Sequence, residues 1–167
     1  NPAADRYPLI GSWRNADRTA LISFLKNLQT EIGGRDPRIT KVIAMLSAQE
    51  SDILMYNSAG ELKYESRPMG SISVSVVYTQ DGKVENKSVS LSFRMGTEML
   101  TRELMLELAE RATTGIDERF AARRPKGGKM PVVMGAGASG ILLHEAMGHA
   151  FEADFNRKGQ SIFSDKM

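Results

Sequence analysis

The apolar positions near the N-terminus repeat with the period of an α-helix. Asp17 is a residue type that caps helix starts, and Gly33-Gly34 is a typical helix end. Between them, apolar residues recur at helical spacing at Leu21, Ile22, Phe24, Leu25, Leu28 and Ile32. The pattern predicts a helix between Asp17 and Gly33.

After Pro37 the pattern changes to short β-like runs separated by turns. Residues 71–76 alternate serine with aliphatic residues, as expected of a strand with one buried face. Asn57 to Gly60 and Asp81-Gly82 have the composition of tight turns. We predict an antiparallel meander of about five strands, at residues 40–46, 53–56, 61–66, 71–76 and 84–95.

The second half of the chain returns to helical spacing. Residues 97–120 are predicted to be helical, with Gly115 as a point of interruption. The basic, glycine-containing run 123–129 is typical of a solvated linker. Three elements follow it: a strand at 130–134, a glycine turn at 135–140 and a helix at 141–153. The predicted fold class is α+β, a β-meander flanked by helices and followed by strand, glycine turn and helix.

The composition is that of a globular protein and argues against two kinds of partner. Apolar residues make up 41% of the 167 residues, and no run approaches the roughly 18 to 20 apolar residues of a membrane span. A net charge of +2 spread along the chain does not form a nucleic-acid footprint. The chain begins at Asn1-Pro2 without a signal-peptide pattern, and we expect its natural start to lie upstream.

Both histidines of the chain lie in the motif His144-Glu145-Ala146-Met147-Gly148-His149. Neutral imidazole is the commonest zinc ligand, and a carboxylate beside a ligand can act as general base on a water that the metal activates. The alternative is that both are incidental helix residues. Because the entire histidine supply falls in one motif, we predict that His144 and His149 bind zinc and that Glu145 is the catalytic base.

The spacing of this pair is one residue longer than in the familiar His-Glu-x-x-His zinc helix. In a regular α-helix, positions five apart lie roughly 140° apart around the axis, which is too far to share one ion. A wider turn of the π type brings them together, and Gly148 tolerates an unusual backbone. We predict a π-bulge or a local break between His144 and His149.

Two histidines do not complete a catalytic zinc site, which generally has three protein ligands and a water. Glu152 and Asp154 follow His149 closely enough to be a further ligand or a hydrogen-bonding partner of one. The interpretation that we favour is that both are ordinary polar residues at a helix end. The chain has no cysteine, so it contributes no thiolate ligand.

The motif Gly135-x-Gly137-x-x-Gly140 offers a competing interpretation, a dinucleotide-binding βα unit. It lies between a predicted strand and a predicted helix, and Asp165 is near the distance expected of a ribose-binding acid. Against it, residues 161–164 are a poor second strand, and a nucleotide domain needs several more βα units. A glycine turn that lets a helix pack closely on a strand is the simpler interpretation.

Two stretches near the C-terminus form a specific pattern: Met130-Pro-Val-Val-Met-Gly-Ala-Gly and Gly140-Ile-Leu-Leu-His-Glu-Ala-Met-Gly-His-Ala-Phe-Glu-Ala-Asp-Phe-Asn-Arg-Lys-Gly159. This pattern resembles the TldD branch of the TldD/PmbA family, bacterial and archaeal metallopeptidases also called modulators of DNA gyrase. The resemblance implies that residues 1–125 are the later part of an α+β N-terminal domain. Residues 126–129 are then a linker, and residues 130–167 begin the zinc metallopeptidase domain.

The same resemblance implies an activity and partners. It implies hydrolysis of peptides or unfolded polypeptides in the cytoplasm, by a homodimer or a TldD–TldE-like heterodimer, without direct nucleic-acid or membrane contact. His144 and His149 match the family's zinc ligands, and Glu145 matches its catalytic glutamate. The family's third ligand is a cysteine in a large C-terminal domain. We therefore expect this chain to be a truncated fragment of a family member that is inactive alone. The alternative is a structural or dimerisation module.

Overall fold

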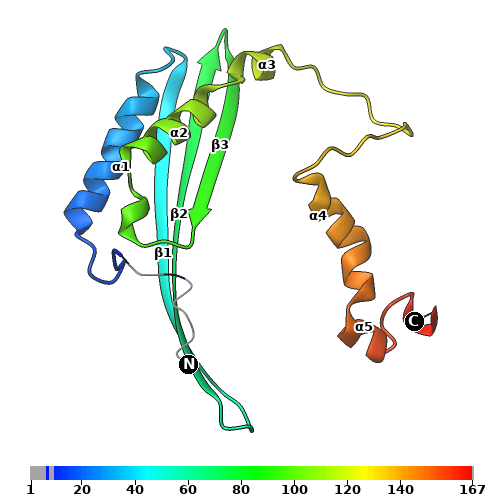
Figure 1. Ribbon diagram of the computed structural model, residues 1–167. Helices are drawn as coiled ribbons and strands as arrows, with labels where there is room; N and C mark the ends of the chain where they lie inside the picture. The colour runs from blue at the N-terminus through cyan, green and yellow to red at the C-terminus, as the bar shows by residue number, and fades with distance from the viewer. Residues whose placement is uncertain (1–6, 8–9, 167) are drawn as a thin grey trace. The chain divides into compact units, whose positions relative to one another are not determined.

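The computed structural model describes Tyr7 and residues 10–166, which form two compact units divided between Arg123 and Arg124. The first unit contains a three-stranded antiparallel sheet and the helices that pack on it (Figure 1). The second unit is built from short helical segments. The predicted α+β class is confirmed.

Helix α1, Arg18–Gly33, forms where the apolar spacing predicts it. The side chain of Asp17 caps its start by accepting a hydrogen bond of 2.8 Å from the backbone N–H of Thr19. Leu28 and Ile32 are fully buried, whereas Ile22 is 54% exposed because it lies on the outer side of the helix. The buried stripe of α1 is therefore narrower than the apolar stripe that the sequence predicts.

The sheet has three long strands in place of the predicted five, in the order β1-β2-β3. Strand β1, Ile39–Tyr56, joins two of the predicted runs, and β2, Leu62–Gln80, joins two more. The predicted count was wrong because pairing continues through the polar residues between the runs, for example at Asp52 opposite Ser66. Strand β3, Lys83–Phe93, pairs only with residues 70–80, so β1 and β2 continue beyond it as a two-stranded ribbon (Figure 1).

The core lies between one face of the sheet and the helices that cover it (Figure 1). Buried and partly exposed positions alternate along β2, and the buried residues that face the core include Ile72, Val74, Val76 and Tyr78. Helix α2, Arg102–Thr113, supplies Leu104, Leu108, Ala109 and Ala112 to the same cluster. The hydroxyl of Tyr78 donates a 2.8 Å hydrogen bond to the Ala112 carbonyl, which ties the central strand to this helix.

The predicted helix over 97–120 is divided into three pieces. A 3-10 turn, η1, spans Thr97–Met99 and precedes α2. Gly115 follows with a φ of 74°, a left-handed conformation that favours glycine, and α3, Ile116–Ala121, starts after it. The predicted interruption at Gly115 is confirmed.

In the second unit, residues 130–134 do not form the strand that their apolar character predicts. A strand needs a neighbour to pair its backbone groups, and the described part of this unit contains no other strand. A helical segment follows, made of α4, Ser139–Leu143, then η2, His144–Gly148, and η3, His149–Phe151. Helix α5, Ala153–Arg157, and a 3-10 turn, η4, Ser164–Lys166, complete the unit. No helix within the described ranges is both long and apolar enough to cross a membrane.

Candidate metal centre

The helical segment that carries the histidines changes its winding at His144. Residues His144–Gly148 form a π turn, in which the N–H of His149 donates to the carbonyl of His144 five residues earlier. This wider turn corrects the angular mismatch that a regular α-helix imposes on positions five apart. The predicted π-bulge between the two histidines is therefore confirmed.

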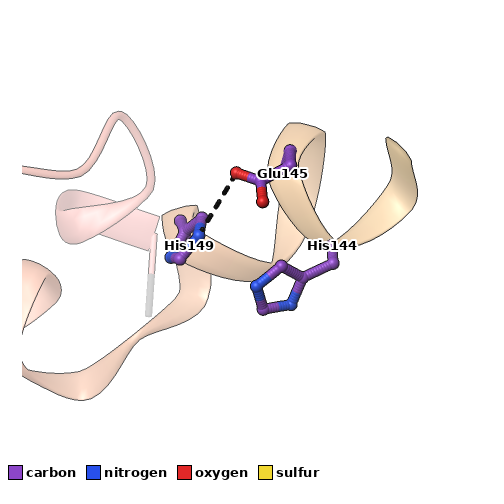
Figure 2. A group of neighbouring side chains, drawn as sticks. All are labelled: His144, Glu145 and His149. Atoms are coloured by element: carbon purple, nitrogen blue, oxygen red, sulfur yellow. Dashed lines mark ion pairs between the residues drawn. The ribbon is translucent and has the colours of Figure 1, made fainter. Parts of the chain in front are cut away.

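The π turn brings three candidate metal donors together. Ligand atoms of His144, Glu145 and His149 all lie within 4.8 Å of one another (Figure 2). The two imidazole rings meet edge-on, with centroids 4.6 Å apart and an interplanar angle of 65°. Oε2 of Glu145 is 3.4 Å from Nε2 of His149. All three side chains are exposed.

Gly148 makes room for this arrangement. A Cβ atom at position 148 would lie 3.2 Å from Nδ1 of His144, which is tighter than nine in ten such contacts in proteins. The backbone of Gly148 is itself helical, with φ −56° and ψ −52°, so the residue is needed for space and not for a special conformation. The prediction that Gly148 is needed for an unusual backbone is therefore wrong: Gly148 leaves space for the ring of His144.

The structure separates the two acidic residues that follow His149. Oε1 of Glu152 lies 2.8 Å from Nδ1 of His149, so this carboxylate contacts the ring on a different nitrogen from Glu145. Asp154 is in the first turn of α5 and is not in the donor cluster. Glu152 is thus more than the ordinary helix-end residue that we favoured from the sequence.

Asn156 is a structural residue whose role was not predicted from the sequence. Its Nδ2 donates to the carbonyls of Ala150, at 3.0 Å, and Glu152, at 2.9 Å. Ser161 donates to the same Ala150 carbonyl, at 2.5 Å. These bonds fold the chain after η3 back on itself, and a lone asparagine gives no sequence signal for such a role.

The donor set fits a metal ion such as zinc. Two imidazoles and a carboxylate converge, and the missing Cβ of Gly148 leaves the ring of His144 free to approach its partner. Imidazole and carboxylate are both donor types that bind zinc. The three residues predicted from the sequence are the three that the fold brings together.

The competing dinucleotide motif lacks its structural context. The fingerprint needs a strand directly before the glycine turn, because the turn joins that strand to the helix whose N-terminus binds the pyrophosphate. Residues 130–134 are not a strand, and residues 161–163 do not form one either. The glycines at 135–140 therefore introduce a helix without the βα geometry of a nucleotide site.

Two protein-family models match this chain. A model described as "PmbA/TldA metallopeptidase central domain" matches residues 12–118. A second, "PmbA/TldA metallopeptidase C-terminal domain", matches residues 127–167. The chain belongs to the PmbA/TldD metallopeptidase family.

Relatives of this family member carry names that imply a metal ion. The chain is 35% identical over 172 residues to "Metalloprotease TldD homolog" of Haemophilus influenzae, covering all of this chain and 36% of that protein. It is 32% identical to the Buchnera aphidicola homologue of the same name from strain APS, covering 78% of this chain and 28% of the relative. It is also 29% identical to "Metalloprotease" of Methanothermobacter thermautotrophicus, and the match covers 71% of this chain and 26% of the relative. The chain spans about a third of the length of these relatives or less.

Proposed function

We propose that residues 139–157 carry the zinc-binding and catalytic motif of a peptidase that hydrolyses peptides or unfolded polypeptides. The observation that carries this proposal is the π turn, which makes a pair of histidines five residues apart converge with Glu145. Membership in a metallopeptidase family supports the reaction class. In this proposal His144 and His149 bind the ion, and Glu145 is the catalytic base.

A zinc ion held by His144 and His149 would supply Lewis acidity, which would favour attack by water on the scissile carbonyl. The protein supplies proton transfer through Glu145, whose side chain is 62% exposed and faces the histidine pair (Figure 2). Glu145 takes a proton from the water as the oxygen of the water adds to the carbonyl carbon. It then delivers that proton to the departing amine as the C–N bond breaks.

Two imidazoles and a base leave the ligand set incomplete, since catalytic zinc generally has three protein ligands. The family resemblance implies a cysteine as the remaining ligand, and this chain has none. We therefore propose that the third ligand belongs to another part of the complete protein and that these 167 residues alone have little peptidase activity. The resemblance also implies a cytoplasmic homodimer or TldD–TldE-like heterodimer, in which residues 126–129 link the domains.

The test is a comparison of Glu145→Gln with the unchanged complete protein. Zinc content and hydrolysis of an unfolded polypeptide are measured on both, with Asp154→Asn as a matched loss of charge outside the cluster. We expect Glu145→Gln to retain zinc and to lose hydrolysis by about 10²- to 10⁴-fold, the usual contribution of general acid–base catalysis. Equal loss of zinc and activity would instead make Glu145 a ligand or a structural residue.

A second pair of variants tests the ligands themselves. His144→Ala and His149→Ala should each lower the zinc content of the complete protein, because each removes one of the converging imidazoles. If the unchanged protein binds no stoichiometric metal, the peptidase proposal fails. The structural or dimerisation role would then be the remaining interpretation of this chain.

A further inference from the structure

The two ring nitrogens of His149 face different carboxylates. Nδ1 is 2.8 Å from Oε1 of Glu152, and Nε2 is 3.4 Å from Oε2 of Glu145. An ionised carboxylate only accepts hydrogen bonds, so for a neutral ring the shorter contact is a hydrogen bond only in the tautomer that carries its hydrogen on Nδ1. The neutral ring then keeps its lone pair on Nε2, the nitrogen beside Glu145.

We propose that Glu152 is a positioning residue that fixes the tautomer and the ring orientation of His149 for metal binding. The inference rests on the proposed function, in which His149 is a ligand, and adds a residue that acts through it. Carboxylates that accept from the far nitrogen of a ligating histidine hold the ring in place and raise its basicity. Glu152 has the position and the chemistry for this role.

Glu152 is itself fixed by the backbone turn between η3 and α5. Its N–H donates to the carbonyl of His149, at 3.3 Å, and its carbonyl accepts from Nδ2 of Asn156, at 2.9 Å. Neither bond involves the Glu152 carboxylate. The turn therefore presents the carboxylate to His149 independently of the contact that it makes there.

The geometry argues against Glu152 as a ligand of the same ion. The converging donors are His144, Glu145 and His149, and Glu152 is not among them. Since the nitrogens of one imidazole point in divergent directions, a group bonded to Nδ1 lies away from an ion on Nε2. The effect of Glu152 is also specific to one ring, because Glu152 contacts the His149 ring and, among the described residues, the His144 imidazole has no hydrogen bond.

The first experiment measures the tautomer without any metal. The chain contains only two histidines, so nitrogen-15 and carbon-13 shifts of both rings can be assigned in the metal-free protein at alkaline pH. We expect the Nδ1–H form at His149 in the unchanged chain and in Glu152→Gln, whose amide oxygen still accepts. Glu152→Ala should shift His149 toward the Nε2–H form and leave His144 unchanged. An Nε2–H ring at His149 in the unchanged chain would overturn the proposal.

The second experiment measures zinc affinity of the complete protein by competition with a chelator. Glu152→Ala should weaken binding by about 10- to 100-fold, as is usual when such a partner of a ligand is lost. Glu152→Gln should recover most of that loss, and the control Asp154→Asn should match the unchanged protein. Equal affinities for Glu152→Ala and Asp154→Asn would overturn the proposal.

The two experiments also separate this inference from the proposed function. If the unchanged complete protein binds no zinc, the proposed function fails, and the tautomer measurement alone decides whether Glu152 sets the state of His149. If zinc binds and depends on His149 but not on Glu152, the proposed function stands and the positioning role is rejected.

Discussion

The backbone of Gly148 lies directly against the imidazole of His144, so that an added Cβ would approach Nδ1 to 3.2 Å. The residue that precedes one candidate ligand thus provides the space for the other. This contact explains why a glycine occupies a helical backbone position, where it is otherwise unfavourable.

Gly148→Ala therefore sets two effects against each other. Alanine stabilises a helical backbone by up to about 1 kcal/mol relative to glycine, but its methyl group displaces the ring of His144 by a few tenths of an ångström. We expect unchanged or higher helical stability together with weaker zinc binding. Gly140→Ala is the matched control, because it lies in α4 and its added Cβ meets no atom within 4 Å. Equal zinc affinity in the two variants would contradict the prediction.

Local signals explain what the sequence could predict. The limits of α1 follow from Asp17 and Gly33-Gly34, because capping depends on the neighbouring residues alone. The interruption at Gly115 is similarly local. The π turn followed from a conflict between the histidine spacing and helix geometry, which can be calculated without knowing the fold.

Pairing between distant segments explains what the sequence could not predict. Polar residues such as Asp52 interrupt the apolar pattern of β1, and only the partner Ser66 shows that the strand continues. Residues 130–134 have the composition of a strand but no neighbour in their unit. The contacts of Glu152 and Asn156 depend on a turn that carries no sequence motif.

Tyr78→Phe should destabilise the first unit. The Tyr78 side chain is fully buried, and its hydroxyl donates to the Ala112 carbonyl. Burial raises the pKa of Tyr78, so the hydroxyl keeps its proton. Removing it leaves a buried carbonyl without its donor, which costs about 1 to 3 kcal/mol.

The measurement for Tyr78→Phe is urea unfolding followed by the fluorescence of Trp13, the single tryptophan of the chain. Tyr64→Phe is the control: its hydroxyl also donates, to Asp52 at 2.9 Å, but the residue is 61% exposed. Water replaces that partner, so the control should change stability by no more than about 0.5 kcal/mol. Similar losses in both variants would show that burial does not decide the effect.

Asp36 should make stability depend on pH in the acid range. Hydrogen bonds from the Arg38 side chain hold the pKa of Asp36 below its ordinary value, although partial burial opposes this. Because the pKa is lower in the folded state, the contribution is present above the unfolded value of about 3.9 and is lost as pH falls through the folded pKa.

Asp36→Asn should therefore lower the free energy of unfolding near pH 7 and reduce its dependence on pH below about 4. The measurement is urea unfolding at a series of pH values, and the two curves should converge at the acid end. Asp117→Asn is the comparison, since Asp117 also accepts from Arg38 but is 80% exposed, and its effect should be smaller. A difference between the unchanged protein and Asp36→Asn that stays constant with pH would rule out this linkage.

Asn156 should control the order of the turn that holds Glu152. Asn156→Ala removes donors to two carbonyls, each bond contributing about 0.5 to 1.5 kcal/mol. Amide hydrogen exchange over residues 149–163 should become faster, whereas the control Gln160→Ala, an exposed amide nearby, should leave it unchanged. Asn156→Asp should speed exchange more than Asn156→Ala does, because the oxygen that replaces Nδ2 faces the same two carbonyls with no hydrogen to donate. The other oxygen, Oδ1, is buried with no partner among the described residues. If the amides of residues 149–163 exchange more slowly in Asn156→Asp than in Asn156→Ala, the carbonyls of Ala150 and Glu152 are held by something other than the Asn156 amide.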